Sequence, residues 1–327
     1  MKNLKNSVIH WFLSAGTVFL LTAIVSISVY GQANGVKLDQ PGYYRLAIGE
    51  IEVIAVSDGT LPIDLLQVLT NTTPKEVNEL LADNFQSNPV AVSVNAYLIK
   101  LQDKLILVDC GAAELYGPTL GNISTSLKRA GYTPEQIDAI LITHIHADHT
   151  GGLVSEGKMV FPNADIYISK GEIDFWLDPQ GASKRPDLKK SFADAQAKVG
   201  PYLKAGKVKA FDSNKELFPG IKPIPSPGHT PGHTFYALEN HGEKILFWGD
   251  LMHVESVQFA NPSVTIAFDV DSEKAAIARK KAYHEAANEG YWVASDHISF
   301  PGIGHVKAEK KNYVWVPINY STYSSGQ

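Results

Sequence analysis

Apolar runs alternate with polar, glycine- and proline-rich stretches along the chain after Gly35. This pattern predicts neighbouring strands in "SVNAYLIK" and "KLILVDCG", joined by a turn at Gln102 and Asp103. It predicts further strands in "IDAILIT", "ADIYIS", "KVKAFD", "KPIPSPG", "TFYALE", "KILFWGD" and "YWVASDH". Helices are expected in "ISTSLKRAG", near Gly171 to Leu177 and from Asp271 to Asn288. Strands and helices alternate in both halves, which predicts an α/β fold with two sheets between helical layers.

The N-terminus has a different pattern from the rest. Lys2 and Lys5 precede a long apolar run, and no Asp, Glu, Lys or Arg follows until Lys37. A short basic segment, an apolar run and then small residues are typical of a secretory signal peptide, so we expect residues 1–33 to be one and residues 34–327 to form one domain. The run is also long enough for an uncleaved membrane anchor. Both interpretations predict an exported protein, periplasmic or secreted.

Composition narrows the class of protein. With 44% apolar and 19% charged residues, the chain of 327 residues is typical of a globular protein. The formal net charge of −5 offers no basic surface for nucleic acid, so a small-molecule partner is favoured. Cys110 is the single cysteine, so no disulfide can form within the chain, and we expect a packed thiol rather than a ligand.

The segment "LITHIHADHTGG" concentrates ligand-type side chains directly after a predicted buried strand. His144, His146, Asp148 and His149 lie in a loop there, so their side chains can converge. Imidazole nitrogen and carboxylate oxygen suit Zn²⁺ and similar divalent ions. The other interpretation of each single histidine is an ordinary polar loop residue.

More such residues follow predicted strands in the C-terminal half. His229 and His233 lie in "SPGHTPGHT", Asp250 ends "ILFWGD", and His297 follows "YWVASD". Active sites of α/β folds concentrate beyond the carboxyl ends of strands. The sequence therefore predicts a metal centre at one edge of the sheets.

The strings "THIHADHTGG", "SPGHTPGHT" and "WGD", with a late histidine after a strand, resemble the metallo-β-lactamase superfamily. The resemblance implies an αβ/βα four-layer sandwich with a binuclear metal site at one edge. Within the superfamily the chain looks most similar to methyl parathion hydrolase and its esterase and lactonase relatives, over "PGYYRLAIGE", "LYGPTLGN", "VQFANPSVTIAFD", "ISFPGIGHV" and "WVPINYS".

The resemblance also implies two sets of metal ligands with a bridge between them. These are His144, His146 and His229 for one ion, Asp148, His149 and His297 for the other, and Asp250 between the two. His305 is a weaker candidate that could exchange roles with His297. The ligand set fits two Zn²⁺ ions per chain and would also accept Mn²⁺, Co²⁺ or Fe²⁺.

Two cations about 3.5–4 Å apart would supply hydroxide at neutral pH to attack a carbonyl carbon or a phosphorus. No Gly-x-Ser-x-Gly motif suggests a serine nucleophile. We expect Asp250 and His253 to be catalytic, with His253 donating to a carbonyl oxygen or a leaving group, although a merely solvated His253 is the alternative. Asp109 and His233 are expected to orient ligands or, alternatively, to make ordinary capping and turn hydrogen bonds.

By the resemblance, three residues match aromatic residues that line the family's substrate pocket: Tyr116, Trp176 and Phe192. His253, Ile266 and Phe268 are expected in the same pocket as departures from the family. Aromatic walls favour a substrate with an apolar ring. The polar His253, with Ile266 and Phe268 crowding the same wall, favours aryl esters and lactones over phosphotriesters, which we expect as a slower side activity. Organophosphate triester hydrolysis as the main activity is the alternative, and core packing is the alternative for Phe192.

Other classes fit less well. A β-lactamase should offer a site for the antibiotic's carboxylate, a glyoxalase-II-like thioesterase a basic patch, and a nuclease positive charge; none is evident. A non-catalytic exported metal-binding protein is a distant alternative, because structural zinc sites are closed. A homodimer is possible, since aromatic residues between Tyr313 and Tyr323 could serve an interface or the core.

Overall fold

The computed structural model describes residues 39–322. The predicted signal peptide, residues 1–33, lies outside this range. The chain divides into Met1–Gln40 and Pro41–Gln327, and every helix and strand described below belongs to the second unit. Within the described residues, no helix combines the length and apolar character needed to cross a bilayer.

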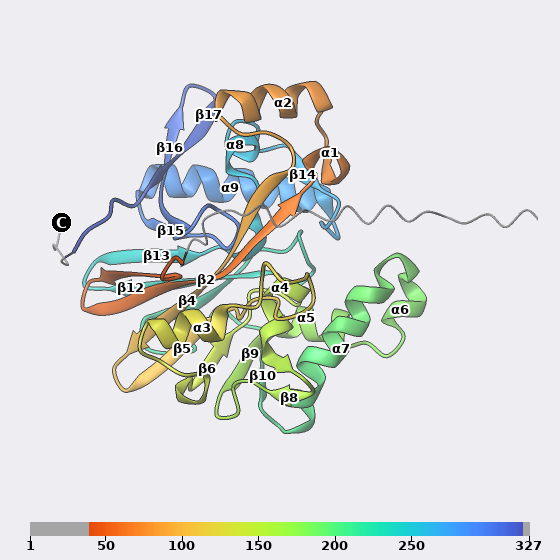
Figure 1. Cartoon of the computed structure of the whole chain (residues 1–327), viewed down its shortest axis with the longest axis vertical. Helices are drawn as coiled ribbons and strands as arrows, with labels where there is room; N and C mark the ends of the chain where they lie inside the picture. The colour runs from red at the N-terminus through yellow and green to blue at the C-terminus, as the bar shows by residue number, and fades with distance from the viewer. Residues whose placement is uncertain (1–38, 323–327) are drawn as a thin grey trace, which may run out of the picture. The chain divides into compact units, whose positions relative to one another are not determined.

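Two mixed β-sheets form the centre of the Pro41–Gln327 unit (Figure 1). The first has seven strands in the order β1-β2-β4-β5-β6-β9-β10. Their bounds are Tyr43–Ile48, Ile51–Ile63, Val90–Leu101, Lys104–Val108, Ala139–Leu141, Asp165–Ser169 and Val208–Phe211. The second has six strands in the order β11-β12-β13-β15-β16-β17. Their bounds are Ile221–Pro225, Thr234–Asn240, Glu243–Phe247, Trp292–Ala294, Ile303–Glu309 and Asn312–Pro317. Two small sheets pair β3 (Leu69–Thr70) with β14 (Thr265–Ile266) and β7 (Val154–Ser155) with β8 (Lys158–Met159).

Helices cover the outer faces of both sheets. The α-helices are α1 (Leu65–Val68), α2 (Pro74–Asp83), α3 (Ile123–Arg129), α4 (Ala147–Thr150), α5 (Lys170–Trp176), α6 (Gly181–Lys184), α7 (Lys189–Lys204), α8 (Glu255–Gln258) and α9 (Ser272–Glu289). Short 3₁₀ turns are η1 (Pro134–Gln136), η2 (Gly151–Leu153), η3 (Pro186–Leu188) and η4 (Gly249–Leu251).

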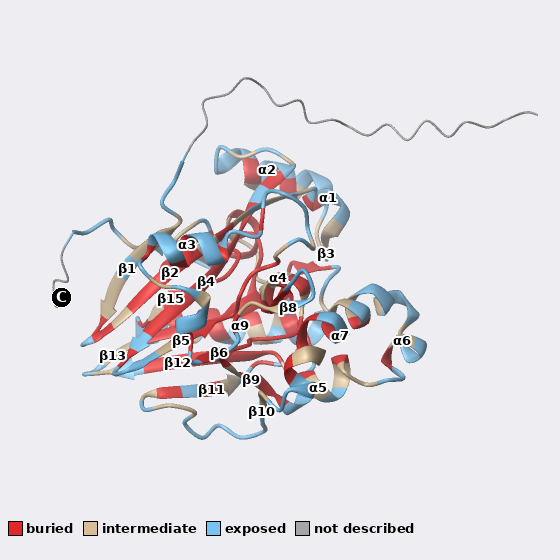
Figure 2. Cartoon of the chain, turned by 60° about the horizontal axis from the view of Figure 1, so that its bottom comes forward, coloured by how far each residue is buried: buried red, intermediate tan, exposed pale blue. Residues whose placement is uncertain are grey.

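Three layers of apolar contact hold the sandwich together (Figure 2). One lies between the first sheet and α3, α5 and α7, where Leu127 and Val199 are fully buried. The second lies between the two sheets and includes Tyr97 and Phe247, whose rings are 5.4 Å apart. The third lies between the second sheet and α9, where Tyr283 stacks on Trp248. This is the expected αβ/βα four-layer sandwich, because each sheet buries one face against its partner and the other against helices.

The predicted strands and helices are present; several strands are shorter than the apolar runs suggested, whereas β4 extends beyond the predicted run at both ends. In "IDAILITHIHADHTGG" only Ala139–Leu141 is a strand, and the backbone after it becomes loop and then α4. The apolar pattern continues to Ile145 because the loop is also buried. The apolar pattern did not predict the strands β1, β2, β16 and β17 or the 16-residue helix α7.

Candidate metal centre

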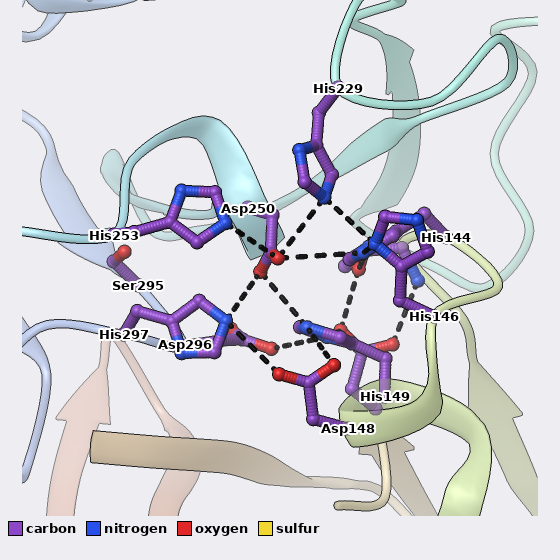
Figure 3. Close-up of polar contacts among 12 residues, drawn as sticks. His144, His146, Asp148, His149, His229, Asp250, His253, Ser295, Asp296 and His297 are labelled. Carbon is purple, nitrogen blue, oxygen red and sulfur yellow. Dashed lines mark hydrogen bonds and ion pairs between the residues drawn. The ribbon is translucent and has the colours of Figure 1, made fainter. Parts of the chain in front are cut away.

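The ligand-type residues come from segments far apart in the chain and meet at one edge of the two sheets (Figure 3). His144 and His146 follow β6, and the next helix, α4, carries Asp148 and His149. The other three follow or precede strands of the second sheet: His229 between β11 and β12, Asp250 in η4 after β13, and His297 after β15. Sheet topology therefore adds His229, Asp250 and His297 to the four residues that are already close in sequence.

The first group contains His144, His146, His229 and Asp250, with one ligand atom of each within 4.8 Å of all the others. Nε2 of His144 and Nε2 of His229 each lie 3.0 Å from Nδ1 of His146. Oδ2 of Asp250 lies 3.2 Å from Nε2 of His229 and 3.5 Å from Nε2 of His144. Three ring nitrogens and one carboxylate oxygen thus face a common centre, which we call subsite 1.

The second group contains Asp148, His149 and His297. The other oxygen of Asp250, Oδ1, lies 2.9 Å from Nε2 of His149 and 3.0 Å from Nε2 of His297. Asp148 reaches the same two nitrogens at 3.8 and 3.5 Å. We call this group, with Oδ1 of Asp250, subsite 2. Each subsite therefore faces its own oxygen of Asp250, as a bridging carboxylate requires.

The chemistry of these donors fits metal ions better than internal hydrogen bonds. The outer nitrogens of His144 and His229 already contact Thr143 Oγ1 at 3.0 Å and Asp269 Oδ1 at 2.8 Å. A neutral imidazole carries one proton, so nitrogens that converge on Nδ1 of His146 present mainly lone pairs to one another. In subsite 2, Nε2 of His149 and Oδ1 of Asp250 are buried and have no hydrogen bond of acceptable geometry. Buried lone pairs without partners are costly, and a divalent cation would satisfy them.

Burial and neighbouring charge set the protonation of the cluster. Burial holds the pKa of His144 and that of His146 well below the ordinary value, so both are neutral as ligands must be. Burial also opposes the charged form of His229, but Asp250 and Asp269 outweigh it and raise the pKa of His229 to about 9. At neutral pH this ring therefore carries an extra proton in the absence of metal, and a metal ion would have to displace that proton. The pKa of Asp250 stays well below its usual range, because the surrounding histidines, His149 first, outweigh its burial.

Asp109 and His233 lie behind the ligand-type residues and hydrogen-bond to them or to their neighbours. Asp109, at the end of β5, accepts hydrogen bonds from the N–H and the hydroxyl of Thr143 at 2.9 and 2.6 Å, and its Oδ2 lies 2.9 Å from Nδ1 of His149. His233 contacts Ser226 O through Nδ1 at 3.2 Å and accepts the N–H of Asp250 through Nε2 at 3.1 Å. The structure thus places Asp109 behind subsite 2 and His233 behind the bridge, where each can orient a ligand.

Sequence reasoning missed three buried carboxylates around the site. Asp269 contacts His229, and Asp296 lies 3.2 Å from Nδ1 of His149. Burial, together with the charge of Asp109, raises the pKa of Asp296 well above its ordinary value. Glu172 on α5 accepts backbone N–H groups from two ligand loops, those of Ile145 and Gly232. Asp296 had a signal in the sequence, since it follows an apolar strand directly before His297, whereas Asp269 and Glu172 had none.

The predicted pocket residues divide into exposed and buried sets. Tyr116 and Phe268 are 40% and 44% exposed, and the Phe268 ring centroid lies 6.3 Å from that of His253. Trp176 is buried, with its ring 5.3 Å from that of His146. Phe192 is buried behind Trp176, with its ring 5.1 Å from the Trp176 ring, so it contributes to the core. Ile266 is also buried, on β14.

Three further predictions concern His253, His305 and Cys110. His253 is buried, with Nε2 3.0 Å from Oδ2 of Asp250 and its backbone N–H bonded to Gln258. The ring centroid of His305 on β16 lies 3.9 Å from that of Trp292. His305 belongs to none of the groups of His and Asp ligand atoms among residues 39–322, so the prediction that it could exchange roles with His297 was wrong. Cys110 is fully buried in the core, as expected of a packed thiol, and its Sγ donates to His149 O.

A model of the metallo-beta-lactamase superfamily matches residues 89–287 of the 327, more than half of the chain, so the chain belongs to this superfamily. Among solved structures it is similar to the hydrolase AbOPH of the beta lactamase superfamily, with 36% identity and a TM-score of 0.83 over 87% of this chain and 100% of that one. It is also similar to AidC, a dizinc quorum-quenching lactonase solved with the product N-hexanoyl-L-homoserine, with 29% identity and a TM-score of 0.77 over 86% and 99% of the two chains.

Curated relatives include N-acyl homoserine lactonases. The chain is 26% identical to one from Bacillus sp over 246 residues, which are 69% of this chain and 85% of that protein. It is 29% identical to one from Bacillus cereus over 171 residues, a match to 46% of this chain that spans 60% of the length of the lactonase.

Proposed function

We propose that the protein is a binuclear metal-dependent hydrolase that cleaves lactones and aryl esters of small molecules. The observation that carries the proposal is Asp250, whose two oxygens face two separate groups of ligand nitrogens. The chain's membership of the superfamily and its similarity to a dizinc lactonase support the same chemistry. Zn²⁺ fits the imidazole and carboxylate donors, and Mn²⁺, Co²⁺ or Fe²⁺ are alternatives.

Two divalent cations in these subsites would acidify a water and polarise the bond to be cleaved. The chain's own residues perform the other tasks. Asp250 holds the two groups of histidines together and supplies negative charge between them. Asp109 and Asp269 hold the rings of His149 and His229 in place through Nδ1, leaving Nε2 free as the ligand atom. His253, beside Asp250, carries a ring nitrogen that can donate to a carbonyl oxygen or to a leaving group.

Side chains around the centre favour a substrate with an apolar or aromatic part. Phe268 and Tyr116 are large aromatic side chains with substantial exposure, and the Phe268 ring lies near that of His253. An aryl or acyl group packed on such rings gains from apolar burial and from ring stacking. Organophosphate triesters with an aryl leaving group share this feature, so we propose them as slower substrates and, alternatively, as the main ones.

The test compares substrates and metal content in one preparation. Metal is measured on the purified protein, and turnover is measured on dihydrocoumarin, N-hexanoyl homoserine lactone, an aryl acetate and methyl paraoxon. We expect about two metals per chain and faster turnover of lactone or aryl ester, with both properties lost in Asp250→Ala. Faster turnover of methyl paraoxon would overturn the substrate ranking, and a metal-free, inactive wild type would overturn the proposed function.

A further inference from the structure

Glu172 is a buried carboxylate next to the metal centre that the proposed chemistry does not use. It lies in the first turn of α5 and is fully buried. Burial raises its pKa. Among the residues that the structure describes, no Lys, Arg or His forms an ion pair with it. A buried carboxylate is costly, so its position calls for a specific role.

Both carboxylate oxygens of Glu172 accept backbone hydrogen bonds from the loops that carry subsite 1. The N–H of Ile145 donates to Oε2 at 2.7 Å, and the N–H of Gly232 donates to Oε1 at 2.8 Å. Ile145 lies between His144 and His146 in the chain, and Gly232 lies three residues after His229. One side chain therefore connects the two segments that supply all three histidines of subsite 1.

The surrounding packing makes this connection rigid. A Cβ atom on Gly232 would lie 2.4 Å from the Glu172 nitrogen and 2.5 Å from Ser169 Oγ, so only glycine allows the loop to approach α5 this closely. The hydroxyl of Ser169, the residue before α5, donates to the carbonyl of Gly232 at 2.7 Å. Thr234 donates to the same carbonyl at 2.8 Å. The start of α5 thus holds the loop of His229 through both the N–H and the carbonyl of Gly232.

A carboxylate suits this position for a simple reason. Both of its oxygens are acceptors, whereas an amide of the same size offers one acceptor and one donor. Glutamine at position 172 would satisfy one loop and present N–H groups to the N–H of the other. The N–H left unsatisfied, buried against α5, would favour movement of that loop away from the helix.

We propose that Glu172 is a positioning residue that sets the spacing between the His144–His146 loop and the His229 loop, and thereby the metal affinity of subsite 1. The proposal rests on the proposed function only in requiring that subsite 1 binds a metal. Subsite 2 depends on α4 and on the segment after β15, which Glu172 does not contact in its hydrogen bonds. The effect is therefore specific to one subsite.

The experiment measures metal affinity at each subsite, using Zn²⁺ and a competing chromogenic chelator. His229→Ala and His297→Ala assign the two steps of the wild-type titration to subsites 1 and 2. In Glu172→Gln we expect the subsite 1 affinity to fall about 10–100-fold, the range found when a group that orients a metal ligand is lost. The subsite 2 affinity should stay unchanged, because Glu172 hydrogen-bonds to neither of the segments that carry its ligands.

Asp58→Asn is the matched control. Asp58 is also fully buried, and it accepts the N–H groups of Ala112 at 2.9 Å, in a loop, and of Ile123 at 3.1 Å, at the start of α3; neither segment carries a proposed ligand. We expect Asp58→Asn to lower the melting temperature of the metal-free protein but to leave both metal affinities unchanged. If Glu172→Gln does not fold, Glu172→Asp replaces it, because the shorter side chain reaches one loop at a time and should weaken the same subsite.

Three results would overturn the proposal. Equal weakening of both subsites, or of neither, would show that Glu172 only stabilises the fold. Weakening of subsite 1 by Asp58→Asn would show that any buried carboxylate has this effect. A wild type that binds no metal would overturn this proposal together with the proposed function, whereas one that binds two metals without turnover would overturn the function alone.

Discussion

Asp269 offers a direct test of how a buried carboxylate tunes one metal subsite. Its Oδ1 lies 2.8 Å from Nδ1 of His229, and its Oδ2 accepts the N–H of Ile266 at 3.1 Å. Asp269→Asn preserves the size of the side chain but leaves one acceptor for these two donors. If the amide oxygen faces His229, the amide nitrogen faces the N–H of Ile266.

The magnitude follows from these contacts. The hydrogen bond from His229 to a carboxylate is charge-assisted, and such bonds contribute about 1.5–3 kcal/mol. Loss of a group that supports a metal ligand typically lowers the metal affinity about 10–100-fold. This range agrees with the energy of the hydrogen bond, since about 1.4 kcal/mol corresponds to a tenfold change in affinity. We therefore expect about a 10–100-fold loss of Zn²⁺ affinity at subsite 1 and little change at subsite 2, which His229 does not join.

The assay is the same two-step chelator titration, with Asp271→Asn as control. Asp271 is two residues away and caps α9 by accepting the N–H of Lys274, a role that asparagine also fills well. Asp269→Asn should shift the subsite 1 step, and Asp271→Asn should shift neither step. An unchanged subsite 1 step in Asp269→Asn would refute the argument that this hydrogen bond supports the ligand.

Three further predictions follow from the same structure. Asp250→Asn should lower the metal affinity of both subsites by at least about 100-fold, because one oxygen of Asp250 serves each subsite and even residues that only support a ligand contribute about 10–100-fold. Metal content is measured by elemental analysis after gel filtration, and two metals still tightly bound would contradict the bridging role. Phe268→Ala should lower kcat/KM for an aryl ester by about 2–10-fold, because the substrate ring would lose an aromatic contact of about 0.5–1.5 kcal/mol. The kcat/KM for an aliphatic ester should hardly change, and equal losses for the two esters would argue against a ring contact. Burial raises the pKa of Asp58, so the folded state binds the proton of this carboxyl more tightly than the unfolded state does. Protonation of Asp58 therefore stabilises the fold below about pH 4, and this stabilisation is lost as the pH rises through the pKa of Asp58 in the folded state. Urea unfolding of wild type and Asp58→Asn should therefore show the wild type gaining stability relative to the variant on acidification from pH 7 towards about pH 4, and a constant difference would contradict the assignment.

Much of the fold could be predicted from local pattern. The strand pair around Gln102 and the C-terminal helix α9 agree with the structure, because apolar periodicity and turn residues are local properties. The strands β1 and β2 were missed although β2 has 13 residues. A helix such as α7, where only five of its 16 residues are buried, has a weak apolar signal and is equally hard to predict.

The sequence by itself determined the donor types of the metal centre. His144, His146, Asp148 and His149 lie in one short segment, so their convergence needs only a loop after a buried strand. Their chemistry as N and O donors is a property of the side chains and does not depend on the fold. The sequence could not tell which aromatic residues are buried, as Trp176 and Phe192 are, and which are exposed, as Phe268 is. An aromatic residue packs equally well in a core or in a pocket.

Only the tertiary structure decided which distant groups support those donors. Glu172 and Asp269 are ordinary acidic residues in the sequence, and each becomes important because the two sheets bring it against a ligand or a ligand loop. The physical reason is burial. Desolvation makes an unpartnered carboxylate costly, so its few hydrogen bonds become strong constraints on position, and burial is set by packing across the whole sandwich rather than by neighbours in sequence.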